Sequence, residues 1–214
     1  MYVSTQEKIP AFVILKSIYE EIDSIINIGN EDSDVLKAMK IPFWIAGGAL
    51  SDLARGSMFK DIDVFTPSPV EALARFKESD IRPYFEVEGR VSNFMVNGHK
   101  VQLVTGYSPK SPADIIDLFD FTAVCGVYDT ETFTCHERFW QDNSVKRLVI
   151  NNLPKPLSTL ERITKYCRKG FRCCPIGLAR VARTINELKI DWDTPKENEM
   201  QFYPDGTPRF TGVD

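Results

Sequence analysis

Residues 43–66, FWIAGGALSDLARGSMFKDIDVFT, constrain the fold of this 214-residue chain more than any other stretch. A short apolar run ends at Gly47 and Gly48, which permit backbone angles that other residues avoid. Apolar residues then recur at helical spacing as far as Gly56, where a helix is expected to stop. The pattern predicts a strand, a tight turn with amides suited to phosphate, a helix of about two turns and a second strand, 61–65.

The second predicted strand carries two carboxylates on one face. Side chains two residues apart in a strand share a face, so Asp61 and Asp63 project together while Ile62 and Val64 enter the core. Mg²⁺ relieves the repulsion between two such carboxylates because it binds carboxylate and phosphate oxygens together. A phosphate-binding turn followed by a carboxylate pair is the combination required for nucleotidyl transfer by two metal ions. Taken singly, the two features are also typical of an ordinary turn and a solvated strand edge.

Periodicity in the rest of the chain predicts an α+β fold, a mixed β-sheet with flanking helices gathered on one side, followed by a small helical segment. Helices are predicted at 10–28, 35–40, 69–78, 111–118, 157–170 and from Pro175, and strands at 43–46, 61–65, 84–87, 91–96, 100–105, 119–128 and 132–135. We expect residues 1–150 to form the main domain, 151–190 a helical appendage and 191–214 an extended or disordered tail.

Polar residues at the predicted helix starts have the spacing of caps. Ser68 with Glu71, and Ser158 with Glu161, match the capping box, in which two side chains bind the free backbone amides of a helix start. Ser111 is a plausible N-cap because a proline, which suits the first helical position, follows it.

Charge is distributed unevenly along the chain. The net charge of −4 argues against a generic nucleic-acid binder. Residues 155–189, however, carry nine Lys or Arg and two Glu. This basic segment predicts either a contact for triphosphate or a nucleic-acid backbone, or a solvated helix face, and the sequence does not decide between them.

Cysteine content and hydropathy indicate the redox state of the thiols and the relation of the chain to membranes. Five cysteines and two histidines, with no paired CxxC motif, predict free thiols and no zinc site. The chain has no apolar run of about 18 residues, and its first residues have no basic region leading into an apolar one. We therefore expect a soluble, cytoplasmic protein without a membrane partner.

Two ordered motifs carry a family resemblance. GGALSDLARG followed by KDIDVF resembles the signature of the polymerase-beta-like nucleotidyltransferase superfamily, in the branch of bacterial poly(A) polymerases and CCA-adding enzymes. DLFDFTAVCGVYD is similar to that branch's Arg-Arg-Asp-Phe-Thr-x-Asn-Ala motif. The resemblance covers about residues 40–130. A weaker similarity follows at TLERITKYCRKGF, which looks like the neck helices of that family. It implies a nucleotidyltransferase head domain within residues 1–150.

The resemblance also implies roles at matching positions. The turn glycines would bind the triphosphate of an NTP, the paired aspartates would bind catalytic Mg²⁺ or Mn²⁺, and the Asp-Phe-Thr element would lie beside the incoming nucleotide. The candidate catalytic and metal-binding residues are Asp61, Asp63 and Asp120. The candidate nucleotide-binding residues are Gly47, Gly48, Ser51, Asp52, Lys60 and Thr122. Lys60 could contact phosphate, but an exposed lysine is the favoured interpretation. Tyr166 and Phe171 could stack on a base, but their helical context favours core packing.

Several positions depart from the family pattern. Ser51 stands where an arginine is usual, and Leu118 and Phe119 replace the Arg-Arg pair. Gln102 falls where the third acidic residue is expected, and glutamine cannot neutralise metal charge. In the predicted strand 119–128, Asp120 shares a face with Thr122 and would point toward the paired aspartates if the strands are neighbours. Either Asp120 is the third ligand or the metal site is weakened.

The function expected from these motifs is metal-dependent transfer of a nucleoside monophosphate from an NTP such as ATP to a hydroxyl of RNA, protein or a small molecule, with pyrophosphate released. A small stand-alone transferase is favoured, because about 60 residues after Pro154 are too few for a helical body that grips tRNA. The alternative is a catalytically retired nucleotidyltransferase fold that acts as a nucleotide-binding, assembly or structural protein. The altered Arg and Gln positions favour the alternative, and the intact Gly-Gly and Asp-x-Asp oppose it.

Overall fold

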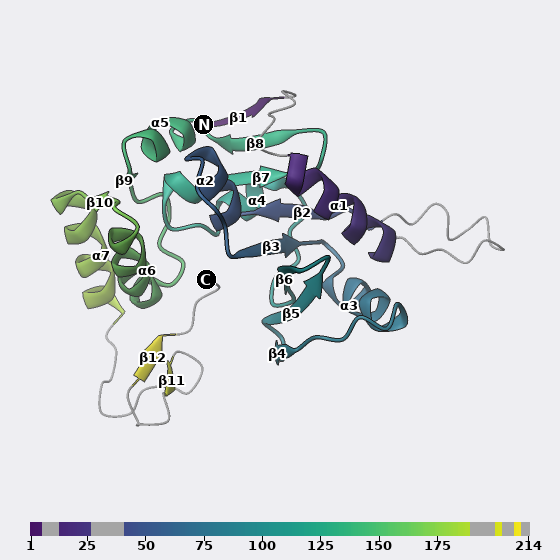
Figure 1. Cartoon of the computed structure of the whole chain (residues 1–214). Helices are drawn as coiled ribbons and strands as arrows, with labels where there is room; N and C mark the ends of the chain where they lie inside the picture. Colours follow the sequence, from purple (N-terminus) through teal and green to yellow (C-terminus); the bar gives the residue numbers. More distant parts are fainter. Residues whose placement is uncertain (6–12, 27–40, 189–199, 203–207, 211–214) are drawn as a thin grey trace.

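The fold is built on an eight-stranded mixed β-sheet. The computed structural model describes residues 1–5, 13–26, 41–188, 200–202 and 208–210. The sheet order is β1-β8-β7-β2-β3-β6-β5-β4, with β3 and β6 parallel and the other neighbours antiparallel (Figure 1). The strands are β1 (Tyr2–Thr5), β2 (Trp44–Ala46), β3 (Asp61–Phe65), β4 (Phe85–Val87), β5 (Val91–Val96), β6 (His99–Val104), β7 (Gly126–Tyr128) and β8 (Phe133–His136). The predicted α+β class is confirmed.

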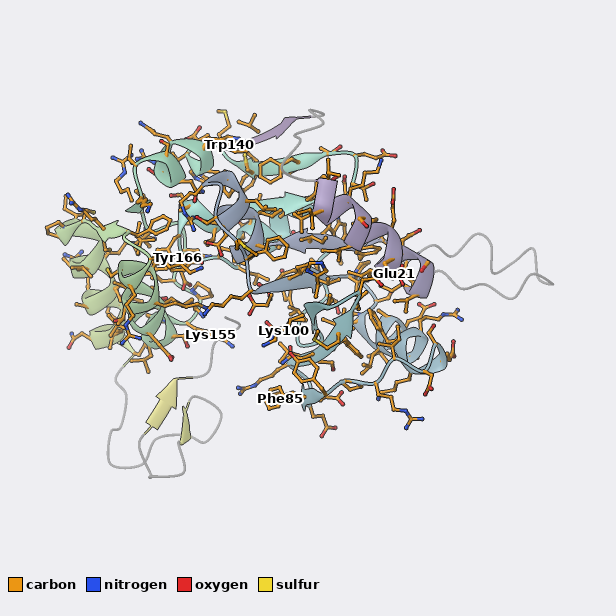
Figure 2. The ribbon with its side chains drawn as sticks, in the orientation of Figure 1. Glu21, Phe85, Lys100, Trp140, Lys155 and Tyr166 are labelled. Carbon is orange, nitrogen blue, oxygen red and sulfur yellow. The ribbon has the colours of Figure 1, made fainter. Side chains whose placement is uncertain are left out.

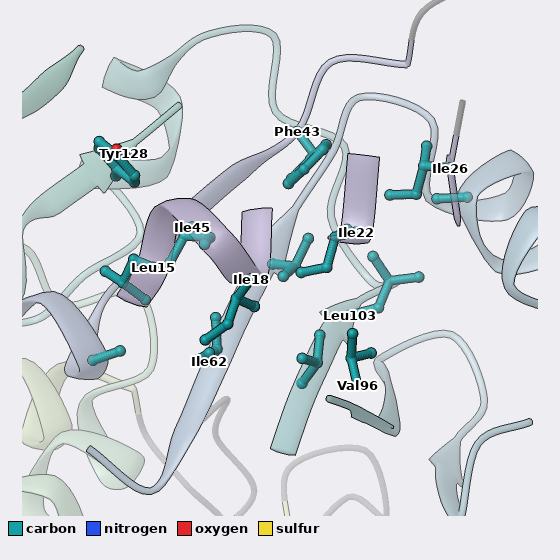
Figure 3. Close-up of a cluster of buried hydrophobic side chains, with 14 of the residues drawn as sticks. Leu15, Ile18, Ile22, Ile26, Phe43, Ile45, Ile62, Val96, Leu103 and Tyr128 are labelled. Atoms are coloured by element: carbon teal, nitrogen blue, oxygen red, sulfur yellow. The ribbon is translucent and has the colours of Figure 1, made fainter. Parts of the chain in front are cut away.

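Helices cover both faces of the sheet, not one face as the sequence predicted. One core cluster joins side chains of α1 (Val13–Ile26), α2 (Gly48–Ala54), α3 (Pro69–Glu78) and α5 (Phe139–Ser144) to the sheet. Ile62 and Val64 of β3 are fully buried in it, and Figure 3 shows Ile62 beside Ile18 of α1. The opposite face packs against α4 (Pro112–Ile116), whose apolar residues contact that face through a separate cluster. Asp61 and Asp63 belong to this second face.

A small helical unit follows the sheet. It contains β9 (Arg147–Leu148), α6 (Pro156–Arg168), β10 (Arg172–Cys173) and α7 (Pro175–Glu187), with β9 and β10 parallel. Its core contains Ile163, Tyr166 and Phe171, which pack on the 121–124 segment. Further on, β11 (Met200–Phe202) pairs with β12 (Pro208–Phe210), an antiparallel pair that the sequence pattern does not predict.

The predicted strand 119–128 is wrong over most of its length. Thr122–Val124 form a 3-10 turn, and only Gly126–Tyr128 form β7. The segment has partners in several parts of the chain: the Thr122 amide donates to the Val149 carbonyl, the Thr122 hydroxyl donates to Asp142, and the Asn143 side-chain amide donates to the Ala123 carbonyl. Two of these partners belong to α5, about 20 residues later.

Two of the predicted helix caps differ from the sequence expectation. Ser68 is the N-cap residue of α3, as predicted, but it makes no side-chain cap hydrogen bond. Ser158 lies inside α6, because Pro156 occupies the first turn and starts the helix earlier. Ser111 is confirmed as the N-cap of α4, in a capping box with Asp114. The five cysteines are free, as predicted. The predicted helix 35–40 lies outside the described residues, and among the helices that are described none has the length and apolar character to cross a membrane.

Candidate functional site

A cleft of 480 Å³ lies between the sheet and α6. Residues from the β2–α2 turn, β3, β6, the 118–124 segment and α6 line it. The polar lining includes Gly48, Asp63, Arg90, Gln102, Asp120, Lys155, Glu161 and Arg162, and the apolar lining includes Phe85, Phe119, Phe121 and Tyr166. In Figure 2, Tyr166 and Lys155 lie on the side of α6 toward the sheet, and Phe85 lies on β4. The cleft is large enough for a small-molecule ligand.

The glycine turn brings the backbone close to the cleft. Gly47 has φ +82°, a left-handed conformation that side chains disfavour, and its amide donates to the Gly126 carbonyl at 3.2 Å. A Cβ at Gly47 would lie 3.3 Å from Asp63 Oδ2 and 3.2 Å from Phe119 Cζ, so the carboxylate and the ring approach the turn closely. Gly48 lines the cleft, and among the residues that the structure describes a Cβ there would come within 4 Å of one atom, Tyr166 Oη, at 3.9 Å.

Gly48→Val is expected to fold and to bind NTP at least about tenfold more weakly, a loss of about 1.4 kcal/mol. A Cβ at Gly48 makes no close contact, and the γ-methyl groups of valine would extend into space where a phosphate would approach the backbone. Isothermal titration calorimetry with each NTP measures the change, and Ser57→Val, an exposed change just beyond α2, is the control. Unchanged affinity in a folded Gly48→Val protein would leave this turn with only a structural role.

The alternation predicted for β3 is confirmed. Asp61 is exposed at the start of the strand, and Asp63 is 6% exposed in the cleft, while Ile62 and Val64 are fully buried on the opposite face. Gln102 of β6 is the direct register partner of Asp63. Its side-chain Oε1 is buried without a hydrogen-bond partner among the described residues. The position expected for a third carboxylate is therefore beside Asp63, and a neutral oxygen occupies it.

Asp120 reaches the cleft, but with a cation already attached. Its carboxylate is 3% exposed, and Arg162 of α6 donates from Nε to its Oδ2. Burial raises the pKa of Asp120, although the adjacent Arg162 guanidinium lowers it in part. Within the described part of the chain, no three His, Cys, Asp or Glu side chains lie close enough together to hold a metal ion. Metal binding by Asp61 and Asp63 stays a prediction, and for Asp120 it competes with this ion pair.

The remaining predicted nucleotide-binding residues do not line the cleft. The Ser51 hydroxyl donates to Asn143 at 2.8 Å and accepts from Arg55 at 2.7 Å. Asp52 pairs with Arg55 and, at 3.0 Å, with Lys169. These contacts tie α2 to α5 and to the end of α6.

Two further predicted nucleotide-binding residues, Thr122 and Lys60, are also not among those that line the cleft. The Thr122 hydroxyl is directed to Asp142, at 2.6 Å. Lys60 is exposed, as the sequence favoured.

Cations in the cleft are the site residues that sequence motifs missed. Arg90, Lys155 and Arg162 all line it. Burial lowers the pKa of Lys155, and Arg90 and Arg162 lower it further, so the surroundings of this lysine are positively charged. The basic segment 155–189 pointed to two of the three residues, whereas nothing in the local sequence marks Arg90.

Tyr166 belongs to the core of the helical unit, as predicted. Its ring lies edge-on to Phe121 and Phe171, with centroids 5.7 and 5.4 Å away. Burial raises its pKa, so the phenol stays neutral. Only its cleft-facing side is available to a ligand.

This arrangement of sheet, turn and cleft is the fold of nucleotidyltransferase head domains. The solved complex of a CCA-adding enzyme with ATP matches it with a TM-score of 0.64, at 14% identity, over 87% of this chain and 47% of that chain. The sequence is more specific: residues 15–146 match the model of the Gabija anti-defense 2 family, and the chain belongs to that family. The predicted resemblance is thus confirmed for the fold, while the motifs did not indicate the family.

Further comparisons set the extent of these similarities. The Thermotoga maritima CCA-adding enzyme complexed with tRNA matches with a TM-score of 0.56, at 14% identity, over 87% of this chain and 47% of that chain. A tRNA nucleotidyltransferase with primer tRNA and an incoming ATP analogue matches with a TM-score of 0.53, at 18% identity, over 72% and 49%. Gabija anti-defense 2 of Bacillus phage SPbetaL7 is 28% identical over 161 residues, 73% of this chain and 40% of that protein. The chain thus spans about two fifths of the length of this curated relative.

Proposed function

We propose that the cleft binds an NTP together with a divalent metal ion, and that the chain transfers a nucleoside monophosphate from it to a hydroxyl acceptor. We further propose that this activity acts against Gabija defence, for which the phage relative, Gabija anti-defense 2, is named. The observation that carries the proposal is that Gly48 and Asp63 line one cleft, with Gly47 holding the turn against the Asp63 carboxylate. The fold shared with a CCA-adding enzyme bound to ATP supports it.

The oxygen atoms of the site suit Mg²⁺ or Mn²⁺. Asp61 and Asp63 would hold the ion from one face of β3, and the buried Gln102 Oε1 beside them lacks a partner among the described residues. Carboxylate, amide and phosphate oxygens are the ligands that Mg²⁺ prefers. When bound, the metal would supply positive charge to the reacting phosphates.

The residues of the cleft would position the reaction. The glycine turn lets the triphosphate approach the backbone, and the packed rings of Phe121 and Tyr166 exclude water from one wall. The acceptor hydroxyl oxygen forms a bond to the α-phosphorus, and the bond from that phosphorus to the bridging oxygen breaks. Pyrophosphate leaves with the electron pair, and the hydroxyl proton passes to solvent. In-line positioning and charge stabilisation account for most of the catalysis of such transfers.

A second candidate function is nucleotide binding without transfer. Gln102 beside Asp63 adds no charge, Asp120 is paired with Arg162, and the described residues contain no group of three His, Cys, Asp or Glu side chains placed to hold a metal ion. Such a protein would act on the defence by binding nucleotide or partner.

Both candidates are tested in one experiment. The protein is incubated with each α-labelled NTP and Mg²⁺ or Mn²⁺, in the presence of total RNA or total protein, and NTP binding is measured on the same preparation. Label transferred to a macromolecule or small molecule supports the transferase. Binding without transfer supports the second candidate, and absence of both contradicts the proposal.

A further inference from the structure

The cleft face of the sheet carries a row of residues that runs outward from Asp63. Gln102 of β6 is the register partner of Asp63 on one side and of Asn93 of β5 on the other. Phe85 of β4 is in turn the register partner of Asn93. Register partners share a face of the sheet and neighbouring strands lie about 4.8 Å apart, so the row extends about 14 Å from Asp63 to Phe85. Asp63, Gln102 and Phe85 all line the cleft.

The glycine turn lies on the opposite side of Asp63 from this row. Strand β3 lies between β2 and β6 in the sheet, and the turn follows directly after β2 (Figure 1). Ala46, the last residue of β2, is the register partner of Asp63. The order across the sheet is therefore the glycine turn, Asp63 and then Gln102.

This order fixes the side from which an acceptor approaches. In an in-line displacement the attacking and leaving oxygens lie on opposite sides of the phosphorus. With the triphosphate of the proposed NTP at the glycine turn and its α-phosphate beside Asp63, pyrophosphate leaves toward β2. The attacking hydroxyl then comes from the β6 side, where Gln102 is the first residue of the row.

The side chain of Gln102 has the chemistry to hold a hydroxyl there. Its Oε1 atom is buried and has no hydrogen-bond partner among the described residues. Buried polar atoms are rarely left unpaired, and an amide oxygen can only accept, so this atom suits a ligand that donates a hydrogen bond. A hydroxyl group is such a donor.

The next row on the same face of the sheet is apolar. Val104, Val91 and Val87 are successive register partners on β6, β5 and β4, and all three line the cleft. With the ring of Phe85, they make the cleft apolar on the β4 side of Gln102. A hydroxyl attached to an apolar or aromatic group fits here, because burial of its apolar surface adds to the hydrogen bond.

We infer that Gln102 binds the acceptor of the transfer: its Oε1 accepts a hydrogen bond from the attacking hydroxyl, and the body of the acceptor lies over the row toward Phe85. The hydroxyl oxygen bonds to the α-phosphorus as the bond from that phosphorus to the bridging oxygen breaks, and pyrophosphate leaves with the electron pair. The hydroxyl proton passes to solvent, because a neutral amide does not retain it. The inference rests on the proposed function, because it assigns the acceptor side of the same reaction.

Gln102→Met tests the hydrogen bond, since it removes the oxygen and keeps the length of the side chain. The acceptor is the fraction, total RNA or total protein, that takes up label in the transfer experiment. Its KM is expected to rise at least about tenfold, while the Kd values for a non-hydrolysable NTP analogue and for Mn²⁺ stay within about twofold of the parent. Gln102→Glu keeps an accepting oxygen and should restore most of the acceptor affinity. Gln141→Met makes the same change at an exposed position of α5, outside the cleft, and should leave all three constants unchanged.

The possible results separate the inference from the proposed function. An unchanged acceptor KM in folded Gln102→Met would overturn the inference. A weakened Mn²⁺ affinity in the same variant would assign the oxygen to the metal site and would also overturn it. Absence of transfer by the parent protein would contradict the proposed function, and the inference with it.

Phe85→Ala keeps the test decisive if Gln102→Met does not fold. The Phe85 side chain is 54% exposed, so the fold loses little packing, and it lies too far along the row to contact the triphosphate. Its removal is expected to raise the acceptor KM at least about threefold and to leave analogue affinity unchanged. Tyr84→Ala removes the neighbouring ring, which is 56% exposed and does not line the cleft, and should change neither constant. An unchanged KM in Phe85→Ala would overturn the inference.

Discussion

Changing Asp61 and Asp63 together to asparagine is expected to abolish Mn²⁺ binding, with a loss of at least about a hundredfold in affinity, and to lower any transfer rate by about a thousandfold or more. Asparagine keeps the shape of the side chain but removes the charge that holds the cation. The fold should be nearly unaffected, because Ile62 and Val64 on the opposite face of β3 carry the packing. Electron paramagnetic resonance measures bound Mn²⁺, and thermal denaturation measures folding.

Asp80→Asn is the matched control for this double change. Asp80 is exposed beyond α3, and its φ of 56° is a conformation that asparagine also adopts readily. It should leave Mn²⁺ affinity unaltered. If the double variant binds Mn²⁺ as tightly as the parent, the metal site is not on β3.

Asp142→Ala is expected to lower the free energy of unfolding by about 1–3 kcal/mol, the usual cost of removing the acceptor of buried hydrogen bonds, because the two arginines left behind are each 38% exposed and can be hydrated. Asp142 is fully buried and accepts from Arg147 at 2.7 Å, from Arg138 at 3.2 Å and from Thr122 at 2.6 Å. Without it, two guanidinium groups lose their counter-charge and the 3-10 turn at 122–124 loses an anchor. Urea denaturation followed by circular dichroism measures the change. Glu137→Ala, which removes an exposed carboxylate 4.0 Å from the N-terminal amine, should cost no more than about 1 kcal/mol.

The same carboxylate predicts an acid limit to stability. Burial opposes ionisation of Asp142, but hydrogen bonds from Arg138, Thr122 and Arg147 outweigh it and hold its pKa below the ordinary value. A depressed folded-state pKa contributes stability that is present above the unfolded pKa, about 3.9, and is lost as pH falls through the folded pKa. Asp142→Ala should therefore flatten the fall in stability below about pH 4. An acid profile identical to that of the parent would contradict this assignment.

Local patterns predicted the elements that are marked by apolar spacing, turn glycines or a helix start within their own sequence. The β2 apolar run, the Gly-Gly turn, the alternation in β3 and the α3 bounds follow from neighbours in sequence, and the structure confirms them. The predicted strand 119–128 was wrong over residues 119–125, whose partners include Val149 and two residues of α5, Asp142 and Asn143, and no periodicity within the segment reports them. In such segments, long-range contacts override local secondary-structure propensity and determine the backbone conformation.

The candidate site also contains some contacts that local sequence predicts and others that it does not. Asp63 and Gln102 became neighbours as their strand faces suggested, because register is set by hydrophobic alternation. The Asp120–Arg162 pair joins residues 42 positions apart, and its effect on available charge became visible only in three dimensions. Sequence motifs therefore located the turn and the aspartates but not the cation that faces them.

The contacts between α2 and the end of α6 determine which wall of the cleft can move to admit a ligand. Asp52 binds Lys169 at 3.0 Å, and the Arg55 guanidinium lies 4.7 Å above the Phe171 ring. These two contacts hold α2 and the end of α6 together. Moving α6 away from the sheet would break both of them. Opening for ligand entry is expected instead at the sheet edge, where Phe85 of β4 lines the cleft with its side chain half-exposed. A nucleotide would thus enter between the fixed α6 wall and the β4–β5 strand pair, and it is the strand pair that would move.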